Sequence, residues 1–317
     1  MGMDALVVDH AAPGLLRLAP VPDPSPAPHE ALVRVAAASV NPGEVRALGG
    51  APAGSVHGWE ASGTVVAPAA DGSGPAAGSP VVTVGAGGGW AELRAVPTSL
   101  LGAVPAGLPV DHAALATLPV AGGSALRALR DSGPLLGRRV LVTGATGGVG
   151  RYAVQLAALG GAEVVATARD AAAADELRRL GATAVLNDPS ELDGPVDAVV
   201  DTVGGPVLVE AFAALGSDGT LVSVGRASGR DAVLPADALL GDRSRHGRTI
   251  RTFFLLDGRP GLDRDLGRLA ALLGRGELRA AVDHVVTFAD APAALAAPRP
   301  GKLVLLAHGP DGPSLAR

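Results

Sequence analysis

The sequence predicts an α/β protein with two domains, one built on a doubly wound parallel sheet and the other smaller and rich in β-strands. Three observations lead to this prediction. From Leu135 onward, strand-like apolar runs alternate with helical segments, a pattern typical of a parallel sheet covered by helices on both faces. A glycine-rich turn joins the first of these strands to its helix. In the first 120 or so residues, short apolar runs alternate instead with connections rich in proline and glycine, which indicates a small β domain.

The β-rich region contains three clear strand candidates. They span residues 30–36, 61–66 and 81–84, and each is a short apolar run between turn-forming residues. The connections 21–28 and 68–75 have the composition of loops, and the prolines of the first make it locally stiff. We expect both to be surface loops rather than linkers between domains.

The second region predicts a regular succession of strands and helices. The apolar run that begins at Val140 suits a strand buried on both faces of its sheet. The expected strands are 140–143, 163–167, 184–186, 197–200 and 220–224, and the expected helices are 148–159, 171–180 and 206–214.

Two later apolar runs decide the domain boundaries. Residues 249–256 and 302–306 are predicted strands, separated by a helix over residues 262–273. We expect the second of these strands to return to the β-rich domain, so that the parallel-sheet domain is an insertion and the cleft between the domains holds the cofactor. The expected boundaries are 1–121 with 284–317 for the β-rich domain and 122–283 for the parallel-sheet domain.

The segment from Val140 to Gly150 reads as strand, tight turn and helix start, which is the arrangement that holds a dinucleotide pyrophosphate in Rossmann domains. Its glycines recur at every third position. This spacing suits a tight turn, a close approach of backbone to phosphate, and close packing of helix on strand. Unpaired N–H groups at the helix start then meet the anion. The residues expected to contact the cofactor here are Gly144, Thr146, Gly147, Gly148 and Val149.

Arg169 indicates which dinucleotide is bound. It follows the predicted strand 163–167, at the position that meets the adenosine ribose. An NAD site usually carries Asp or Glu there, whereas an arginine accommodates the 2′-phosphate of NADP. Asp170, one residue further on, is expected to cap the next helix. The sequence therefore favours NADP(H) over NAD(H).

Composition excludes several classes of function. The chain has 317 residues, of which 48% are hydrophobic and 18% charged, as expected of a globular protein. A net charge of −5 and an aromatic content of 2% argue against a nucleic-acid partner. The absence of cysteine excludes disulfides, thiolate nucleophiles and zinc sites that need sulfur. No signal-peptide pattern and no membrane-spanning apolar run is found, so we expect a cytoplasmic protein with no membrane partner.

Four segments together resemble the medium-chain dehydrogenase/reductase superfamily. They are the glycine turn 144–150, the segment 118–126 before it, the Val-Asn-Pro motif at 40–42, and residues 58–63. The chain is most similar to the zinc-independent branch of quinone oxidoreductases and enoyl reductases. This resemblance implies a GroES-like catalytic domain wrapped around a Rossmann domain. It also implies a homodimer formed through an edge strand, here residues 249–256.

The resemblance further implies that no metal is bound. The zinc-dependent branch carries a cysteine at the position of Asn41 and a histidine at that of Trp59, and only Glu60 remains here. A catalytic zinc needs three protein ligands, and the seven histidines show no close paired spacing. His57 is expected to be a solvated surface residue. Without a metal to polarise an alcohol oxygen, the expected substrate is a small molecule that is already electrophilic, namely a quinone or an enone, of which a polyketide-derived enone is one example.

Asn41 and Arg46 are the candidate catalytic residues. The resemblance implies that Asn41 lies by the nicotinamide and the substrate, and an Asx turn before Pro42 is an equally good explanation of this residue. Arg46 stands where many relatives carry an aromatic hydroxyl; a guanidinium does not act readily as a general acid but can stabilise an enolate electrostatically. Tyr152, the only tyrosine, is expected to be a packing residue. The proton donor is left unassigned.

Further cofactor and pocket residues also follow from the resemblance. The additional cofactor contacts are Val203, Gly225, Arg226 and Phe253, and Arg226 faces either phosphate or solvent. Of Phe253 and Phe254, one is expected in the core and the other at the cleft. The candidate pocket walls are Trp59, Trp90 and Phe254, with core packing as the alternative for each tryptophan. Asp201 is expected to cap a turn.

These expectations favour an NADPH-dependent oxidoreductase that transfers a hydride to an activated C=C bond or a quinone without a metal. Two alternatives stay open. One is a zinc-free carbonyl reductase or alcohol dehydrogenase, and the other is a catalytically weak NADPH-binding protein with a regulatory role. The identity of the substrate depends on the shape of the pocket, which the sequence does not reveal.

Overall fold

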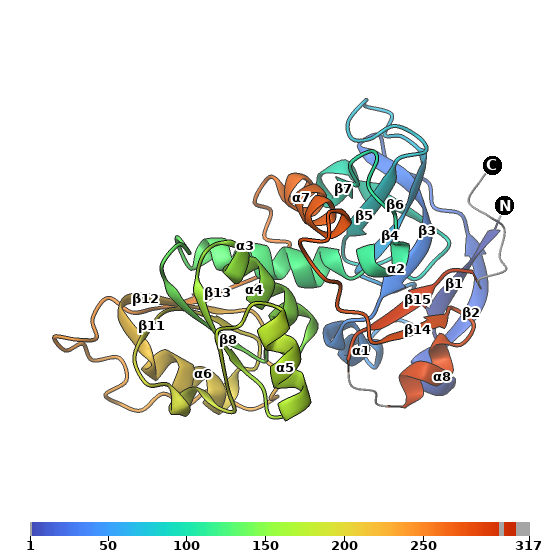
Figure 1. Cartoon of the computed structure of the whole chain (residues 1–317). Coiled ribbons are helices and arrows are strands. Elements are labelled where there is room, and N and C mark those ends of the chain that lie inside the picture. Colours follow the sequence, from blue (N-terminus) through green and yellow to red (C-terminus); the bar gives the residue numbers. More distant parts are fainter. Residues whose placement is uncertain (1, 298–300, 309–317) are drawn as a thin grey trace. The chain divides into compact units, whose positions relative to one another are not determined.

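Two compact units make up the chain. The computed structural model describes residues 2–297 and 301–308. One unit comprises residues 1–120 and 258–317, and the other comprises residues 121–257 (Figure 1). Each unit has its own hydrophobic core. Within the described residues, no helix is both long enough and apolar enough to cross a membrane.

The first unit is built on a mostly antiparallel sheet. Its strands are β3 (Glu30–Ser39), β4 (Glu60–Ala67), β5 (Pro80–Val84), β6 (Leu93–Pro97), β7 (Leu101–Ala103), β14 (His284–Thr287) and β15 (Leu303–Leu306). Their order is β14-β15-β3-β4-β5-β7, and β6 also pairs with β3. A separate antiparallel pair joins β1 (Gly2–Val8) to β2 (Leu16–Pro22). The strands predicted over residues 30–36, 61–66 and 81–84 are confirmed as β3, β4 and β5.

Four helices accompany this sheet among the described residues of the unit. They are α1 (Pro42–Leu48), α2 (His112–Leu115), α7 (Leu262–Gly274) and α8 (Ala291–Ala296), with single 3₁₀ turns at Pro13–Leu15 and Thr98–Leu100. β15 pairs antiparallel with β3, so that Val304 lies opposite Ser39. The prediction that the run 302–306 returns to the β-rich part of the chain is confirmed.

β3 carries the chain from the surface into the interior. Buried side chains alternate with more exposed ones from Glu30 to Ala36, and then Ala37, Ala38 and Ser39 are all buried. The strand thus contributes to core packing along its length and delivers its C-terminal end to the inside of the unit. The chain turns directly from there into α1, which places the Val-Asn-Pro motif in a buried environment.

The second unit is a parallel sheet with the strand order of a Rossmann domain. The order is β10-β9-β8-β11-β12-β13, and all neighbouring strands run parallel. The strands are β8 (Arg139–Thr143), β9 (Glu163–Thr167), β10 (Ala184–Leu186), β11 (Val196–Asp201), β12 (Leu215–Ser223) and β13 (Thr249–Thr252), several of which are labelled in Figure 1. The helices are α3 (Gly123–Asp131), α4 (Gly148–Leu159), α5 (Ala171–Arg179) and α6 (Gly205–Ala213), with a 3₁₀ turn at Pro189–Glu191. A short π-helix at Leu118–Gly122 includes the last residues of the first unit and the first residues of the second. The predicted fold class is confirmed.

Two strands differ in length from the expectation. β12 begins at Leu215, five residues before the predicted start at residue 220, because its first residues continue the pairing with β11 beyond a register shift. The strand expected over residues 249–256 ends at Thr252. β13 is nevertheless the edge strand of the sheet, as expected for this segment.

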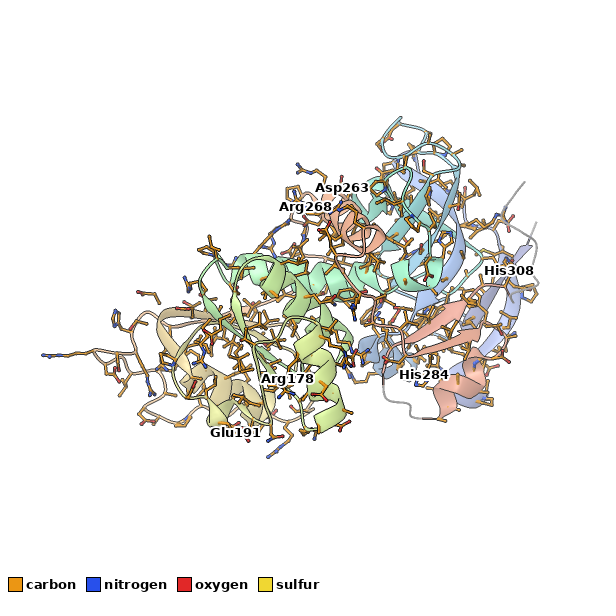
Figure 2. The ribbon with its side chains drawn as sticks, viewed as in Figure 1. Arg178, Glu191, Asp263, Arg268, His284 and His308 are labelled. Atoms are coloured by element: carbon orange, nitrogen blue, oxygen red, sulfur yellow. The ribbon has the colours of Figure 1, made fainter. Side chains whose placement is uncertain are left out.

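Helix α7 corrects the expected domain boundary. The parallel-sheet domain was expected to extend to residue 283, but the second unit ends at Asp257 and α7 belongs to the first unit. Its buried face, which includes Leu266, packs on β7, where a Cβ atom added to Gly102 would lie only 2.7 Å from the backbone nitrogen of Gly267. Arg268 lies on the exposed face of the helix (Figure 2). An amphipathic helix packs where an apolar surface can bury its apolar face, and β7 provides that surface here.

This packing makes Gly102 a sensitive position. We expect Gly102→Val to lower the free energy of unfolding by about 1–3 kcal/mol, because the added atoms overpack the contact with α7. Urea unfolding of the purified variant measures the effect. Gly49→Ala is the control, since a Cβ atom at Gly49 meets nothing within 4 Å and its backbone is already helical. Equal stability of the two variants would contradict the assignment of α7 to this unit.

Candidate active site

The glycine turn after β8 has the geometry of an anion cradle. Gly144 adopts a positive φ of 61°, which few residues other than glycine tolerate. A Cβ atom at Gly150 would lie 2.5 Å from the Cα atom of Ala145, so the start of α4 packs directly on the turn. At Gly147 a Cβ atom would meet only the carbonyl oxygen of Gly144, at 3.4 Å. The space above the middle of the turn is therefore open for a ligand.

The helix that follows this turn begins without a side-chain cap. Gly147 is its N-cap and offers no hydrogen bond to the first backbone N–H groups of α4. Those groups have no partner within the helix, and the helix dipole adds positive potential at this end. Thr146, Gly148 and Val149 lie in the same turn and first helical turn. Together these residues fit the pyrophosphate of a dinucleotide.

Asp201 holds the neighbouring strand end in place. At the end of β11, its carboxylate accepts hydrogen bonds from the Thr143 hydroxyl and from the N–H groups of Val203, at 3.2 Å, and Gly204, at 3.0 Å. Burial raises the pKa of this carboxyl above its ordinary value, and these donors act in the opposite direction. The expectation that Asp201 caps a turn is confirmed, and the cap fixes Val203 beside the end of β8.

The remaining cofactor candidates lie around the same sheet. Gly225 follows β12, and a Cβ atom there would lie 2.7 Å from the carbonyl oxygen of Thr202, so the loops after β11 and β12 are in close contact. Arg226 is exposed. Arg169 is also exposed, just after β9, and Asp170 caps α5 by accepting the N–H of Ala172 at 3.1 Å, as expected.

The two phenylalanines after β13 differ from the expectation. Phe253 is partly buried and Phe254 is 67% exposed, so neither lies in the core. Leu255, the next residue, is the buried one. The segment leaves the sheet after Thr252, and without strand alternation its side chains no longer divide between core and surface as the sequence pattern suggested.

A buried polar cluster lies in the first unit, where the Val-Asn-Pro motif enters α1. It consists of Ser39 at the end of β3, Asn41 and Glu44 at the start of α1, Glu60 at the start of β4, and Lys302 just before β15. None of the five is more than 7% exposed. Segments far apart in the sequence thus meet at one point in the interior of the unit.

Both the side-chain amide and the backbone N–H of Asn41 are hydrogen-bonded within this cluster. Its Nδ2 atom donates to Glu44 Oε2 at 2.9 Å and to Glu60 Oε1 at 2.8 Å, and its Oδ1 atom accepts from Lys302 Nζ at 2.8 Å. Its backbone N–H donates to Glu44 Oε2 at 2.6 Å. Both amide hydrogens are therefore engaged with carboxylates. This role was not among the two expected for Asn41, which were a substrate contact and an Asx turn.

Glu60 is the centre of the cluster. One of its oxygens accepts from Lys302 Nζ at 2.8 Å, from Asn41 and from the Ser39 hydroxyl, and the other accepts from the backbone N–H of Val120 at 2.6 Å. The buried carboxylate is thus paired with an ammonium and satisfied by three further donors. This is the combination that a buried charge requires.

Burial perturbs two further ionisable groups beside this centre. Burial raises the pKa of Glu44 to about 7, and the neighbouring Glu60 carboxylate adds to the increase, while the N–H groups of Trp59 and Asn41 and the Lys302 ammonium oppose it. Burial also lowers the pKa of Arg94 to about 10. The Arg94 guanidinium donates to the carbonyl oxygens of Trp59, at 3.1 Å, and Gly87, at 2.9 Å. Arg94 therefore ties Trp59 to the glycine-rich loop after β5.

The donor set does not fit a catalytic zinc. The amide of Asn41 is saturated, Trp59 offers only an indole, and the Glu60 carboxylate is bound to the Lys302 ammonium. A catalytic zinc needs three protein ligands. Across the described residues, no group of three or more histidine, aspartate or glutamate side chains is arranged to hold a metal ion.

The tryptophans and His57 occupy different environments. Trp90 is completely buried in the core of the first unit and donates its indole N–H to the carbonyl of Ser39 at 3.3 Å, so it packs in the core rather than forming a pocket wall. Trp59 is partly buried, with its ring against Gly43.

His57, which was expected on the surface, is partly buried. Burial lowers the pKa of its imidazole, and its Nδ1 atom has no hydrogen-bond partner in the described structure. Val56, the residue before it, forms an antiparallel bridge with Val7 of β1, and the centroid of the imidazole ring lies 6.4 Å from that of the Trp90 ring.

Two other candidates are separate from the cluster. Arg46 lies on α1 with an exposed side chain. Tyr152 is completely buried in α4, and its expected packing role is confirmed.

The sequence analysis missed Glu44, Lys302 and Arg94. Glu44 follows Asn41 at the spacing of a helix-capping pair, which is a readable signal. Lys302 is the only lysine of the chain, which is also a signal. Nothing in the sequence around Arg94 indicates that this arginine is buried.

The chain is similar to known families and solved structures. Residues 27–106 match the family described as alcohol dehydrogenase GroES-like domain, and residues 148–260 match the family described as zinc-binding dehydrogenase. Prostaglandin reductase-3 of Mus musculus is 30% identical over 299 residues, which cover 86% of this chain and 76% of that protein. The structure of the quinone oxidoreductase from Coxiella burnetii has a TM-score of 0.79 at 26% identity, covering 97% of this chain and 100% of that one. A mycobacterial structure in complex with NADPH has a TM-score of 0.81 at 28% identity, covering 96% of this chain and 99% of that one.

The raised pKa of Glu44 makes stability depend on pH. A folded pKa of about 7 against an ordinary value of 4.5 means that the folded protein holds this proton more tightly than the unfolded chain. The contribution is fully present below pH 4.5 and is lost as the pH rises through about 7, amounting to about 3 kcal/mol. We expect the difference in unfolding free energy between the wild type and Glu44→Gln to change by this order across the interval, measured by urea unfolding at several pH values.

Glu277→Gln is the control of opposite sign. The exposed Arg275 guanidinium lowers the pKa of Glu277, so its contribution is present at neutral pH and is lost as the pH falls. A Glu44→Gln variant whose stability difference from the wild type does not vary with pH would contradict the buried, protonatable state of Glu44.

Proposed function

Because the chain belongs to the medium-chain dehydrogenase/reductase superfamily, in its quinone oxidoreductase and enoyl reductase branch, we propose that it is an NADPH-dependent reductase of activated C=C bonds or quinones that works without a metal. It is an NADP(H)-dependent oxidoreductase with a small-molecule substrate. The observation that supports the metal-free reaction most directly is the bonding of Glu60 to Lys302 where the zinc-dependent branch holds its metal.

The second unit supplies the cofactor site of this proposal. The bare N–H groups at the start of α4, from Gly148 onward, would bind the pyrophosphate. Arg169, exposed after β9, would bind the 2′-phosphate that distinguishes NADPH from NADH. Val203, Gly225 and Phe253 would border the nicotinamide half. When bound, the cofactor supplies a hydride.

The first unit supplies the polar groups for the substrate. In the overall reaction the substrate gains one hydride and one proton, and an oxygen conjugated to the reacting carbon carries negative charge before the proton is added. A hydrogen-bond donor held beside that oxygen in a buried site stabilises this charge. The buried polar cluster around Asn41 holds an ammonium next to a saturated amide and is the group of residues suited to this task.

Arg169 gives the sharpest test of cofactor choice. We expect Arg169→Ala to weaken NADPH binding by about 1.5–3 kcal/mol, the worth of hydrogen bonds to a charged group, and to leave NADH binding almost unchanged. Parallel fluorescence titrations with the two nucleotides measure both values. Arg178→Ala is the control, because Arg178 lies on the exposed side of α5 and pairs with Asp175 (Figure 2). Equal losses for both nucleotides would refute the assignment of Arg169.

The reaction itself is tested with chelator-treated protein. We expect protein dialysed against EDTA to oxidise NADPH with cyclohexenone or benzoquinone at an unchanged rate, and to give cyclohexanone from the enone, with the C=O group intact. Product analysis by mass spectrometry distinguishes this from carbonyl reduction, which would give the allylic alcohol. Activity that disappears with the chelator and returns with zinc would refute the metal-free reaction, and tight NADPH binding without any turnover would favour a regulatory role.

A further inference from the structure

Of the 26 lysine and arginine residues in the chain, Lys302 is the only lysine. The other residues of this set are all arginines, some exposed and some buried. The single exception is buried, with 6% of its side chain exposed, in the polar cluster. A lysine differs from an arginine in having a compact ammonium with three donors that point in three directions, whereas a guanidinium is a planar fork. The buried polar cluster thus contains the only lysine ammonium of the chain.

The backbone at Lys302 is held rigidly. Its N–H donates to a carboxylate oxygen of Asp283 at 2.6 Å, and its carbonyl accepts from the N–H groups of Asp283, at 3.0 Å, and His284, at 3.1 Å. Gly301 before it has a φ of 94°, and a Cβ atom there would lie 2.6 Å from the side chain of Asp283. These hydrogen bonds fix the backbone of Lys302, from which its side chain extends into the cluster.

The hydrogen bonds of the cluster leave one donor available. Both amide hydrogens of Asn41 go to carboxylates, and the Ser39 hydroxyl donates to Glu60. The Lys302 ammonium has three hydrogens and two partners among the described residues, Asn41 Oδ1 and Glu60 Oε1, each at 2.8 Å. A buried N–H without a partner is costly. The third hydrogen thus calls for an acceptor that the described residues do not supply.

We propose that the third ammonium hydrogen of Lys302 donates to the substrate oxygen that becomes negative as the hydride is transferred. This inference rests on the proposed function and assigns to Lys302 the contact that the sequence analysis assigned to Asn41. Asn41 is then a positioning residue, because its Oδ1 atom and Glu60 together fix two of the three ammonium directions. The acceptor is the carbonyl oxygen of an enone or quinone, and no proton transfer from Lys302 is required.

The kinetic test uses paired variants, because Lys302→Met alone leaves the Glu60 carboxylate buried without its partner. Lys302→Met/Glu60→Gln removes both charges, and Glu60→Gln alone keeps the ammonium. We expect the double variant to bind NADPH within about twofold of the wild type and to lose at least about 100-fold in kcat relative to Glu60→Gln, with little change in KM for the enone, since the lost interaction strengthens only in the transition state. A kcat within about threefold of Glu60→Gln would overturn the proposal.

The single lysine also permits a direct observation. Incorporation of ¹⁵N-lysine gives one side-chain Nζ resonance, which belongs to Lys302. With the unreactive pair NADP⁺ and cyclohexenone at saturating concentration, we expect this resonance to shift relative to the NADP⁺ complex. A merely structural lysine would show no enone-dependent shift, and that result would overturn the proposal. A wild type that turns over neither enones nor quinones would refute the proposed function itself, whereas turnover by the wild type with an undiminished double variant would refute only the role of Lys302.

Discussion

The burial of Glu60 next to Lys302 is the interaction on which the rest of the candidate site depends. A carboxylate without access to water must be paired and its oxygens satisfied, and here the partners come from β3, α1, the segment at Val120, and the start of β15. The pair therefore joins sequence segments separated by more than two hundred residues, since Glu60 and Lys302 are 242 positions apart. The buried end of β3 brings Ser39 to Glu60, and the start of α1, which Glu44 caps, brings Asn41 to the same carboxylate.

The glycine turn after β8 depends on a different constraint, namely the geometry of the backbone. Gly144 needs a positive φ, and Gly150 must lack a side chain so that α4 can pack on the turn. The proposed anion site then consists of backbone N–H groups, which every residue except proline has, at a helix start that no side chain caps. Such a site therefore depends on backbone conformation, and so on the glycines at positions 144 and 150, rather than on side-chain chemistry. Under the proposed function, the exposed Arg169 after the next strand would add the charge that selects NADPH.

The proposed metal-free reaction places an ammonium beside Glu60 in a chain that matches the zinc-binding dehydrogenase family. The positions that would hold the metal carry an amide, an indole and a carboxylate, and the carboxylate is neutralised by an ammonium from the same chain. The Trp59 ring packs on Gly43, where a side chain would collide with it, so the indole is accommodated by a glycine of α1. A resident ammonium offers a hydrogen bond to a negative oxygen, which suits substrates that are already electrophilic better than unactivated alcohols.

The sequence by itself determined the fold class, most strands and helices, the glycine turn and its order relative to Arg169, because each depends on local periodicity or on glycine spacing. It did not reveal that α7 packs on β7, since an amphipathic helix shows that it has an apolar face but not which surface covers that face. Nor did it show that Trp90 is a core residue, or that Glu44 and Lys302 meet Asn41 and Glu60. Those contacts depend on sheet register between distant strands, β15 against β3 and β3 against β4. Only the tertiary structure decided them, because the free energy of a buried charge depends on neighbours that lie far away in the sequence.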